Sequence, residues 1–179
     1  MAQGIVERPS SSEYSAAFEG YVSLVPEADV MAALAQQKGE LARALSPVRG
    51  EAERYRYADG KWSIRELVGH VIDSERIFGY RALCIARGEA ASLPGFDENA
   101  YAANAPYGDY PLADLLAEFE QVREGHLFLF RHLSREAWLR VGTANANPLS
   151  VRALAFVTVG HARHHLAILR ERYLPHVRP

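Results

Sequence analysis

Two of the seven histidines in this sequence, His161 and His165, lie four residues apart within the segment HARHH. At this spacing, side chains lie one turn apart on the same face of an α-helix. Two imidazoles so placed can bind one metal ion from a single rigid element, as in the zinc-protease helix, although the glutamate of that motif is absent here. The spacing alone is a weak signal, because a histidine-rich chain contains such pairs by chance.

His70 is a third candidate ligand, since it lies near the inward face of a different predicted helix. A helical bundle can bring such side chains together in its core, and three imidazoles with an open fourth position are typical of a catalytic metal site. The competing interpretation is a histidine hydrogen-bonded in the core or at its rim. We adopt that interpretation for His126, His132 and His176, and for His164 we leave open a place at or just behind the ligands.

Several charged residues are candidates for supporting roles. The segment DSER at 73–76 has the composition of a solvated helix face, but Asp73 or Glu75 could orient a ligand histidine through a hydrogen bond. Arg76, Arg81 and Arg163 could bind a substrate carboxylate with their guanidinium groups. Surface ion pairs are the simpler expectation for each of these arginines.

Other common chemistries lack their motifs. The chain has no Gly-x-Ser-x-Gly elbow and no glycine-rich phosphate loop. A di-iron bundle needs paired Glu-x-x-His motifs, whereas Glu66 and His70 are four residues apart and no second pair exists. The single cysteine, Cys84, excludes an intrachain disulfide and a cysteine-based zinc cluster, and we expect it to fill space in the core.

Composition predicts an ordinary cytoplasmic domain. The 179 residues are 49% hydrophobic and 23% charged, with a net charge of -2, which is typical of one soluble globular domain over 1–179. The charge balance predicts no binding to nucleic acid or to an anionic membrane. No apolar run reaches the roughly 20 residues of a membrane helix. Glu7, Arg8 and Pro9 occupy the place of a signal peptide's apolar segment, so we expect no such peptide.

Hydrophobic periodicity predicts four long helices that would position these residues. After an N-terminal arm over 1–26, an amphipathic pattern spans 27–45, and Ser63 with Glu66 forms a capping box that opens a second helix ending near Gly88. A third helix follows Pro111, and Ser150 is a plausible N-cap for the fourth. The fourth helix has the inward face Leu154, Thr158, His161, His165, Ile168 and Arg172.

The segments between these helices are predicted to be irregular. Residues 88–110 lack periodicity and exceed the usual length of a structureless connection, so they should cross the end of the bundle, cover a site, or both. Their aromatic residues could form a wall or lid, or could simply pack the loop down: Phe96, Tyr101, Tyr107 and Tyr110. A loop is expected over 142–148. The fold class is therefore all-α, a four-helix bundle with one long crossover between its second and third helices.

Three segments resemble the DinB/YfiT-like family, whose members are described as metal-dependent hydrolases. They are KWSIRELVGHVIDSERIFGYRALCIARGE at 61–89, LPGFDENAYA at 93–102 and VRALAFVTVGHARHHLAILRERYLP at 151–175. The resemblance implies an up-down-down-up bundle, often dimeric, with one divalent metal ion held by three histidines. Three neutral imidazoles suit zinc or nickel, which are the metals we expect. The first family ligand matches His70 in GHVID, and the paired ligands match His161 and His165 in GHARHH.

The same resemblance guides the expected function. Characterised relatives include S-transferases that use low-molecular-weight thiols and a thiol-dependent isomerase. We therefore expect a metal-dependent S-transferase that joins a cosubstrate thiol to a small-molecule electrophile. A hydrolase in which the metal activates water is the alternative, and a non-catalytic metal-binding stress protein is a second alternative.

Overall fold

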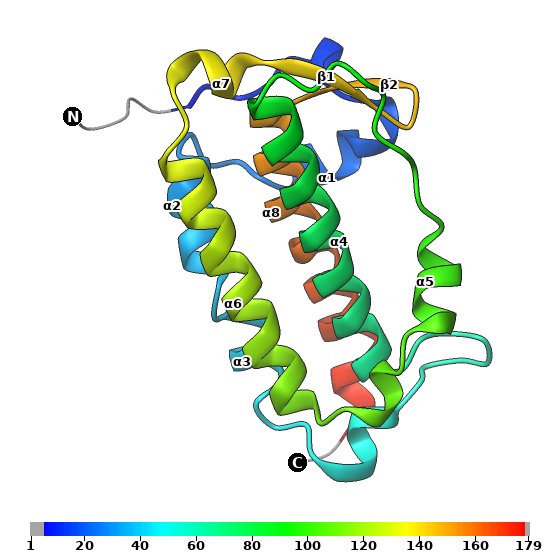
Figure 1. Ribbon diagram of the computed structural model, residues 1–179. Coiled ribbons are helices and arrows are strands. Elements are labelled where there is room, and N and C mark those ends of the chain that lie inside the picture. Colours follow the sequence, from blue (N-terminus) through cyan, green and yellow to red (C-terminus); the bar gives the residue numbers. More distant parts are fainter. Residues whose placement is uncertain (1–5, 178–179) are drawn as a thin grey trace.

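The computed structural model describes residues 6–177 and contains four long helical segments side by side (Figure 1). The first is divided into α2 (Val30–Gln37) and α3 (Glu40–Leu45); the others are α4 (Ile64–Ala86), α6 (Leu112–Arg131) and α8 (Val151–Ile168). Helices α4 and α6 run in the same direction, antiparallel to α2 and α8. This arrangement confirms the predicted bundle and its long crossover.

The capping signals of the sequence explain where the long helices begin. The Ser63 hydroxyl accepts a hydrogen bond from the Glu66 backbone N–H, and the Glu66 carboxylate accepts one from the Ser63 N–H, so the predicted capping box is present. Ser150 caps α8 in a similar way through the N–H of Ala153. Past the end of α4, Gly88 has a φ of 87°, a conformation that glycine adopts without strain.

Two of the predicted helices differ from the structure in detail. The helix expected over 27–45 is interrupted at Gly39, a poor helix former, although its apolar positions are all buried as predicted. At the end of α8, the chain widens into a π-helical turn over Leu169–Tyr173. Leu169 and Tyr173 are buried there, whereas Arg172, predicted to point inward, is exposed.

The connections contain more regular structure than the sequence suggested. The crossover includes the short helix α5 (Glu98–Asn104), which Asp97 caps. The predicted loop over 142–148 is instead a hairpin of β1 (Val141–Ala144) and β2 (Asn147–Ser150). Its two turn residues, Asn145 and Ala146, have φ values of 49° and 60°. Alanine rarely adopts such a φ. The Asn-Gly or Asp-Gly pair that usually marks a hairpin turn is also absent here, so the hairpin has no local sequence signal.

The short helices of the N-terminal arm and of the connection from α6 to the hairpin lie toward the hairpin end of the bundle (Figure 1). Helix α1 (Glu19–Ser23), in the N-terminal arm, packs on α8, and α7 (Arg135–Leu139) links α6 to the hairpin. Two apolar clusters fill the bundle, one toward the hairpin end and one toward the α5 end. Among the described residues, no helix combines the length and the apolar character that crossing a membrane requires.

Candidate metal centre

Three histidine side chains from two helices converge inside the bundle. His70 projects from α4, and His161 and His165 project from successive turns of α8. The Nε2 atom of His161 lies 3.2 Å from the Nε2 of His70 and 3.2 Å from the Nε2 of His165. One nitrogen from each ring lies within 4.8 Å of the other two, and all three residues are buried. The structure thus brings together the three residues that the sequence singled out.

Hydrogen bonding alone does not account for this arrangement. The Nε2 of a neutral imidazole carries either one hydrogen or one lone pair, so His161 Nε2 can form a hydrogen bond with only one of its two neighbours. Tetrahedral zinc with bonds of about 2.0–2.1 Å to nitrogen separates its ligand nitrogens by about 3.3 Å. The 3.2 Å contacts are close to that spacing. The three side chains therefore fit a shared divalent metal ion.

Burial keeps these three imidazoles neutral at physiological pH. Desolvation lowers the pKa of His70 to about 4, and it lowers the pKa of His165 to about 3 with a further contribution from neighbouring histidines. The pKa of the most buried ring, His161, is lowered well below its usual value for the same reasons. A neutral imidazole offers its lone pair to a metal without first losing a proton, so these protonation states favour metal binding at pH 7.

Aromatic rings pack against two of the three histidines, His70 and His161. The Trp62 ring packs on His70 with centroids 4.6 Å apart, and Tyr21 and Phe78 contact His161 edge-on at 5.3 Å and 5.5 Å. Trp62 and Tyr21 were missed from the sequence. Trp62 did carry a signal, because it directly precedes the N-cap of α4, where an apolar residue commonly packs on the next turn of the helix.

A pocket of about 220 Å³ opens beside His165. Trp62, Tyr173 and Leu67 give it apolar walls, and Asn99 of α5 also lines it. The predicted role of 88–110 in covering a site is therefore consistent with the position of α5. The loop aromatics behave differently from one another: Phe96 packs on Tyr101, Tyr107 is buried, and Tyr110 is exposed.

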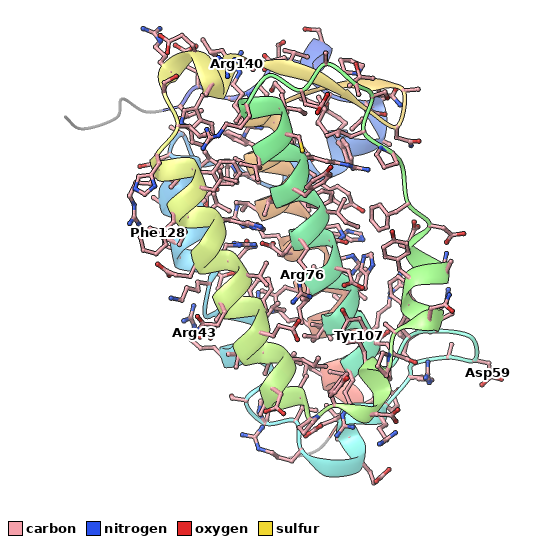
Figure 2. The ribbon with its side chains drawn as sticks, in the orientation of Figure 1. Arg43, Asp59, Arg76, Tyr107, Phe128 and Arg140 are labelled. Carbon is pink, nitrogen blue, oxygen red and sulfur yellow. The ribbon has the colours of Figure 1, made fainter. Side chains whose placement is uncertain are left out.

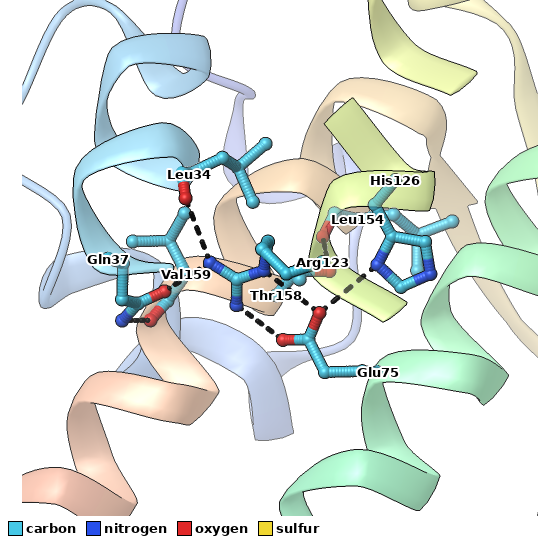
Figure 3. A network of polar contacts seen from close by, with 8 residues as sticks. All are labelled: Leu34, Gln37, Glu75, Arg123, His126, Leu154, Thr158 and Val159. Carbon is cyan, nitrogen blue, oxygen red and sulfur yellow. Dashed lines mark hydrogen bonds and ion pairs between the residues drawn. The ribbon is translucent and has the colours of Figure 1, made fainter. Parts of the chain in front are cut away.

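Glu75 does not lie on a solvated helix face, as the sequence had suggested, because its side chain is only 1% exposed. Its carboxylate accepts hydrogen bonds from Nε and Nη2 of Arg123 and contacts Nδ1 of His126 at 3.1 Å (Figure 3). Arg123 also donates to Gln37 Oε1 and to the Leu34 carbonyl. Glu75 therefore belongs to a buried network in the middle of the bundle and forms no hydrogen bond with the three clustered histidines. His126 is hydrogen-bonded in the core, as predicted.

Asp73 and Arg76 lie on the α4 surface near α6 and the crossover. Asp73 accepts a 2.7 Å hydrogen bond from the Tyr107 hydroxyl, which together with burial raises the pKa of Tyr107. Arg76 pairs with Glu118 of α6 and faces that helix in Figure 2. Neither residue contacts the clustered histidines, and for Arg76 the simpler expectation of an ion pair is confirmed.

Of the other predicted residues, His164 lies beside the clustered histidines, whereas Arg163 and Arg81 have other partners. His164 stays beside the centre, half-buried, with its ring 5.0 Å from that of His165 and 5.4 Å from that of Tyr21. Arg163 forms a two-point ion pair with Glu27, as expected of a structural arginine. Arg81 is buried toward the opposite end of α4, where it donates a 2.8 Å hydrogen bond to the Pro94 carbonyl.

The fold and the site together define a helical bundle with a three-histidine candidate metal centre. A sequence model of the DinB superfamily matches residues 33–169, so the chain belongs to that superfamily. It is 27% identical over 115 residues to a protein of Oceanobacillus iheyensis called "putative metal-dependent hydrolase", a match that covers 64% of this chain and 66% of that protein.

A solved structure supports the same fold. YfiT from Bacillus subtilis, described as "a probable metal-dependent hydrolase with an unusual four-helix bundle topology", superposes with a TM-score of 0.73. The match covers 96% of this chain and 94% of YfiT at 19% sequence identity. At that identity the likeness concerns the fold alone.

Proposed function

We propose that this chain is an enzyme that depends on one divalent metal ion, bound through the Nε2 atoms of His70, His161 and His165. The observation that carries the proposal is the convergence of these three neutral, buried nitrogens at metal-ligand spacing. Membership of the DinB superfamily supports it, as do the descriptions of the two relatives as metal-dependent hydrolases. Imidazole ligands suit zinc and nickel, which are the metals we propose.

The reaction that we propose is thiol transfer to a small-molecule electrophile. Three neutral imidazoles leave the full charge of a divalent metal uncompensated, and such an ion lowers the pKa of a thiol that it binds. In the balanced reaction, a bond forms between the thiol sulfur and the electrophilic carbon, the bond to the leaving group breaks, and the thiol proton is released. The thiol must come from a cosubstrate, because Cys84 is the only cysteine and lies elsewhere on α4.

The protein's own residues would bind and orient the electrophile. The pocket beside His165 has aromatic walls from Trp62 and Tyr173, which suit an apolar ligand body, and Asn99 offers it a hydrogen bond. Tyr21 and Phe78 contact the His161 ring edge-on. These contacts keep water away from the nitrogens and hold the rings in the orientation in which their lone pairs converge.

Metal-dependent hydrolysis is the second candidate function, and the names of the relatives favour it. The two reactions differ in what they require. A transferase consumes an electrophile such as 1-chloro-2,4-dinitrobenzene only when thiol and metal are both present. A hydrolase turns over an ester such as p-nitrophenyl acetate without any thiol.

The test combines metal analysis with these assays on the zinc-loaded and nickel-loaded protein. We expect one metal ion per chain and thiol-dependent turnover, both lost in His161→Ala and both retained in His132→Ala, which alters an exposed histidine remote from the centre. Thiol-independent ester turnover with stoichiometric metal would contradict the proposed transferase reaction and support the hydrolase reaction. Absence of stoichiometric metal after loading would overturn both.

A further inference from the structure

Arg81 carries a buried charge without an acidic partner. The residue is 4% exposed, and among residues 6–177 its polar contacts are one hydrogen bond to the Pro94 carbonyl and a 5.9 Å approach to the Phe96 ring. Desolvation lowers its pKa, but a guanidinium remains charged at neutral pH. An arginine has five N–H donors, and the Pro94 carbonyl accounts for only one of those of Arg81.

Arg123, the other deeply buried arginine among residues 6–177, has its charge paired. Arg123 donates two hydrogen bonds to the Glu75 carboxylate, one to Gln37 and one to a backbone carbonyl. Buried charges are ordinarily paired in this way, because removing an ion from water without compensation is costly. Arg81 therefore lacks an anion that its surroundings would be expected to supply.

A pocket of about 190 Å³ lies where that anion would bind. This volume is far above the roughly 15 Å³ that one water needs. Arg81 lines the pocket together with the N-terminal arm, the start of the crossover and the β1–β2 hairpin, which meet at one end of the bundle (Figure 1). Its walls include Ser15, Phe18, Phe96, Asn145 and Leu149, and the residues that line it include no Asp or Glu.

We propose that this Arg81 pocket binds a small organic acid, whose carboxylate pairs with the Arg81 guanidinium. A carboxylate matches the planar guanidinium through two parallel hydrogen bonds. The Ser15 hydroxyl and the Asn145 amide add polar groups to the wall, while Phe18, Phe96 and Leu149 provide apolar surface for the body of the ligand. An acid with an aromatic or short aliphatic body fits this combination.

The Arg81 pocket is separate from the candidate metal centre. Phe18 lines the pocket and packs edge-on against Phe78 at 6.3 Å, and Phe78 in turn contacts the His161 ring at 5.5 Å. Two aromatic rings thus stand between the pocket and the histidines. The proposal therefore does not depend on the function proposed above.

Titration calorimetry of the metal-loaded 179-residue chain with benzoate, phenylacetate and hexanoate tests the proposal, with benzamide as the neutral counterpart of benzoate. We expect at least one acid to bind and benzamide not to bind. Arg81→Gln should weaken the binding by about tenfold or more, because the charge-assisted pair is lost. The control Arg87→Gln, at an exposed arginine beyond the end of α4, should bind as the unmodified protein does. Failure of all three acids to bind overturns the proposal.

Two further variants separate the alternatives. His161→Ala should still bind the acid. If His161→Ala loses binding while Arg81→Gln retains it, the carboxylate binds the metal and the Arg81 proposal is overturned. The proposed function would not be affected by that result. Arg81→Met, without acid, should match or exceed the unmodified protein in stability toward urea, since it removes an unpaired buried charge. Clear destabilisation by Arg81→Met would instead assign Arg81 a structural role through Pro94.

Discussion

Glu75 and Arg123 form a two-point ion pair that is almost completely removed from solvent, with side-chain exposures of 1% and 0%. The pair joins α4 to α6, and through Gln37, which donates to the Val159 carbonyl, it also ties α2 to α8 (Figure 3). All four helical segments of the bundle are therefore connected by one polar network.

Breaking this pair from one side should be strongly destabilising. Glu75→Gln leaves the Arg123 charge buried without a counterion, so we expect the free energy of unfolding to fall by about 3–5 kcal/mol in urea titrations. The double variant Glu75→Leu/Arg123→Met removes both charges and should recover most of that loss. A loss below about 1 kcal/mol for Glu75→Gln would show that the pair is not as desolvated as its burial indicates.

Gly160 should tolerate no side chain, because α1 crosses α8 at that point. A Cβ at Gly160 would lie 1.9 Å from the backbone oxygen of Tyr21. We expect Gly160→Ala to displace α1, and with it the Tyr21 ring that contacts His161, at a cost of about 2 kcal/mol or more in stability. The matched control is Gly125→Ala in α6, where nothing lies within 4 Å and helix propensity alone should stabilise by about 0.5–1 kcal/mol. Equal effects at the two glycines would contradict the close approach.

The stability of the metal-free protein should fall as the pH drops from about 6.5 to 4. The unfolded chain protonates its histidines near the ordinary pKa of 6.5, whereas folded His70 and His165 do so only near 4 and 3. Over this interval the unfolded state binds more protons, so each such histidine lowers the free energy of unfolding by about 1.4 kcal/mol per pH unit. Above about pH 6.5 these histidines are neutral in both states, so the loss is absent and stability is at its full value.

Urea unfolding at pH 7.5 and pH 4.5, with a chelator present, measures this dependence. The double variant His70→Leu/His165→Leu serves as the control, because its profile should be flatter over the same interval. An unchanged slope in that variant would assign the acid sensitivity to other groups.

Metal should stabilise the protein through the three histidines. A metal ion at about a hundredfold excess over its dissociation constant adds about 2.7 kcal/mol, which corresponds to a rise in Tm of about 5–10 °C for a chain of this size. Thermal denaturation with zinc, with nickel and with chelator measures the shift. His161→Ala should abolish it and His132→Ala should preserve it; a shift that survives in His161→Ala would place the metal elsewhere.

Helix patterning made much of the fold predictable from the sequence. The capping box at Ser63, the N-cap at Ser150 and the apolar stripes are local signals, and each marks an element that the structure contains. The β1–β2 hairpin and the π turn after α8 were not predictable in the same way. The hairpin turn uses Ala146 in a conformation that alanine seldom adopts. In the π turn, Tyr173 is buried and its hydroxyl donates a hydrogen bond to the Trp62 carbonyl, a contact between residues far apart in the chain.

The candidate metal centre was likewise predictable from the sequence only in part. The sequence by itself determined the types and spacing of His161 and His165, because a helix places residues four apart on one face whatever surrounds it. Only the tertiary structure decided that His70 meets them, that Glu75 turns away to Arg123, and that Arg81 lies buried beside a pocket. Those outcomes depend on which helix faces pack together, and hence on burial and contacts between residues far apart in the chain.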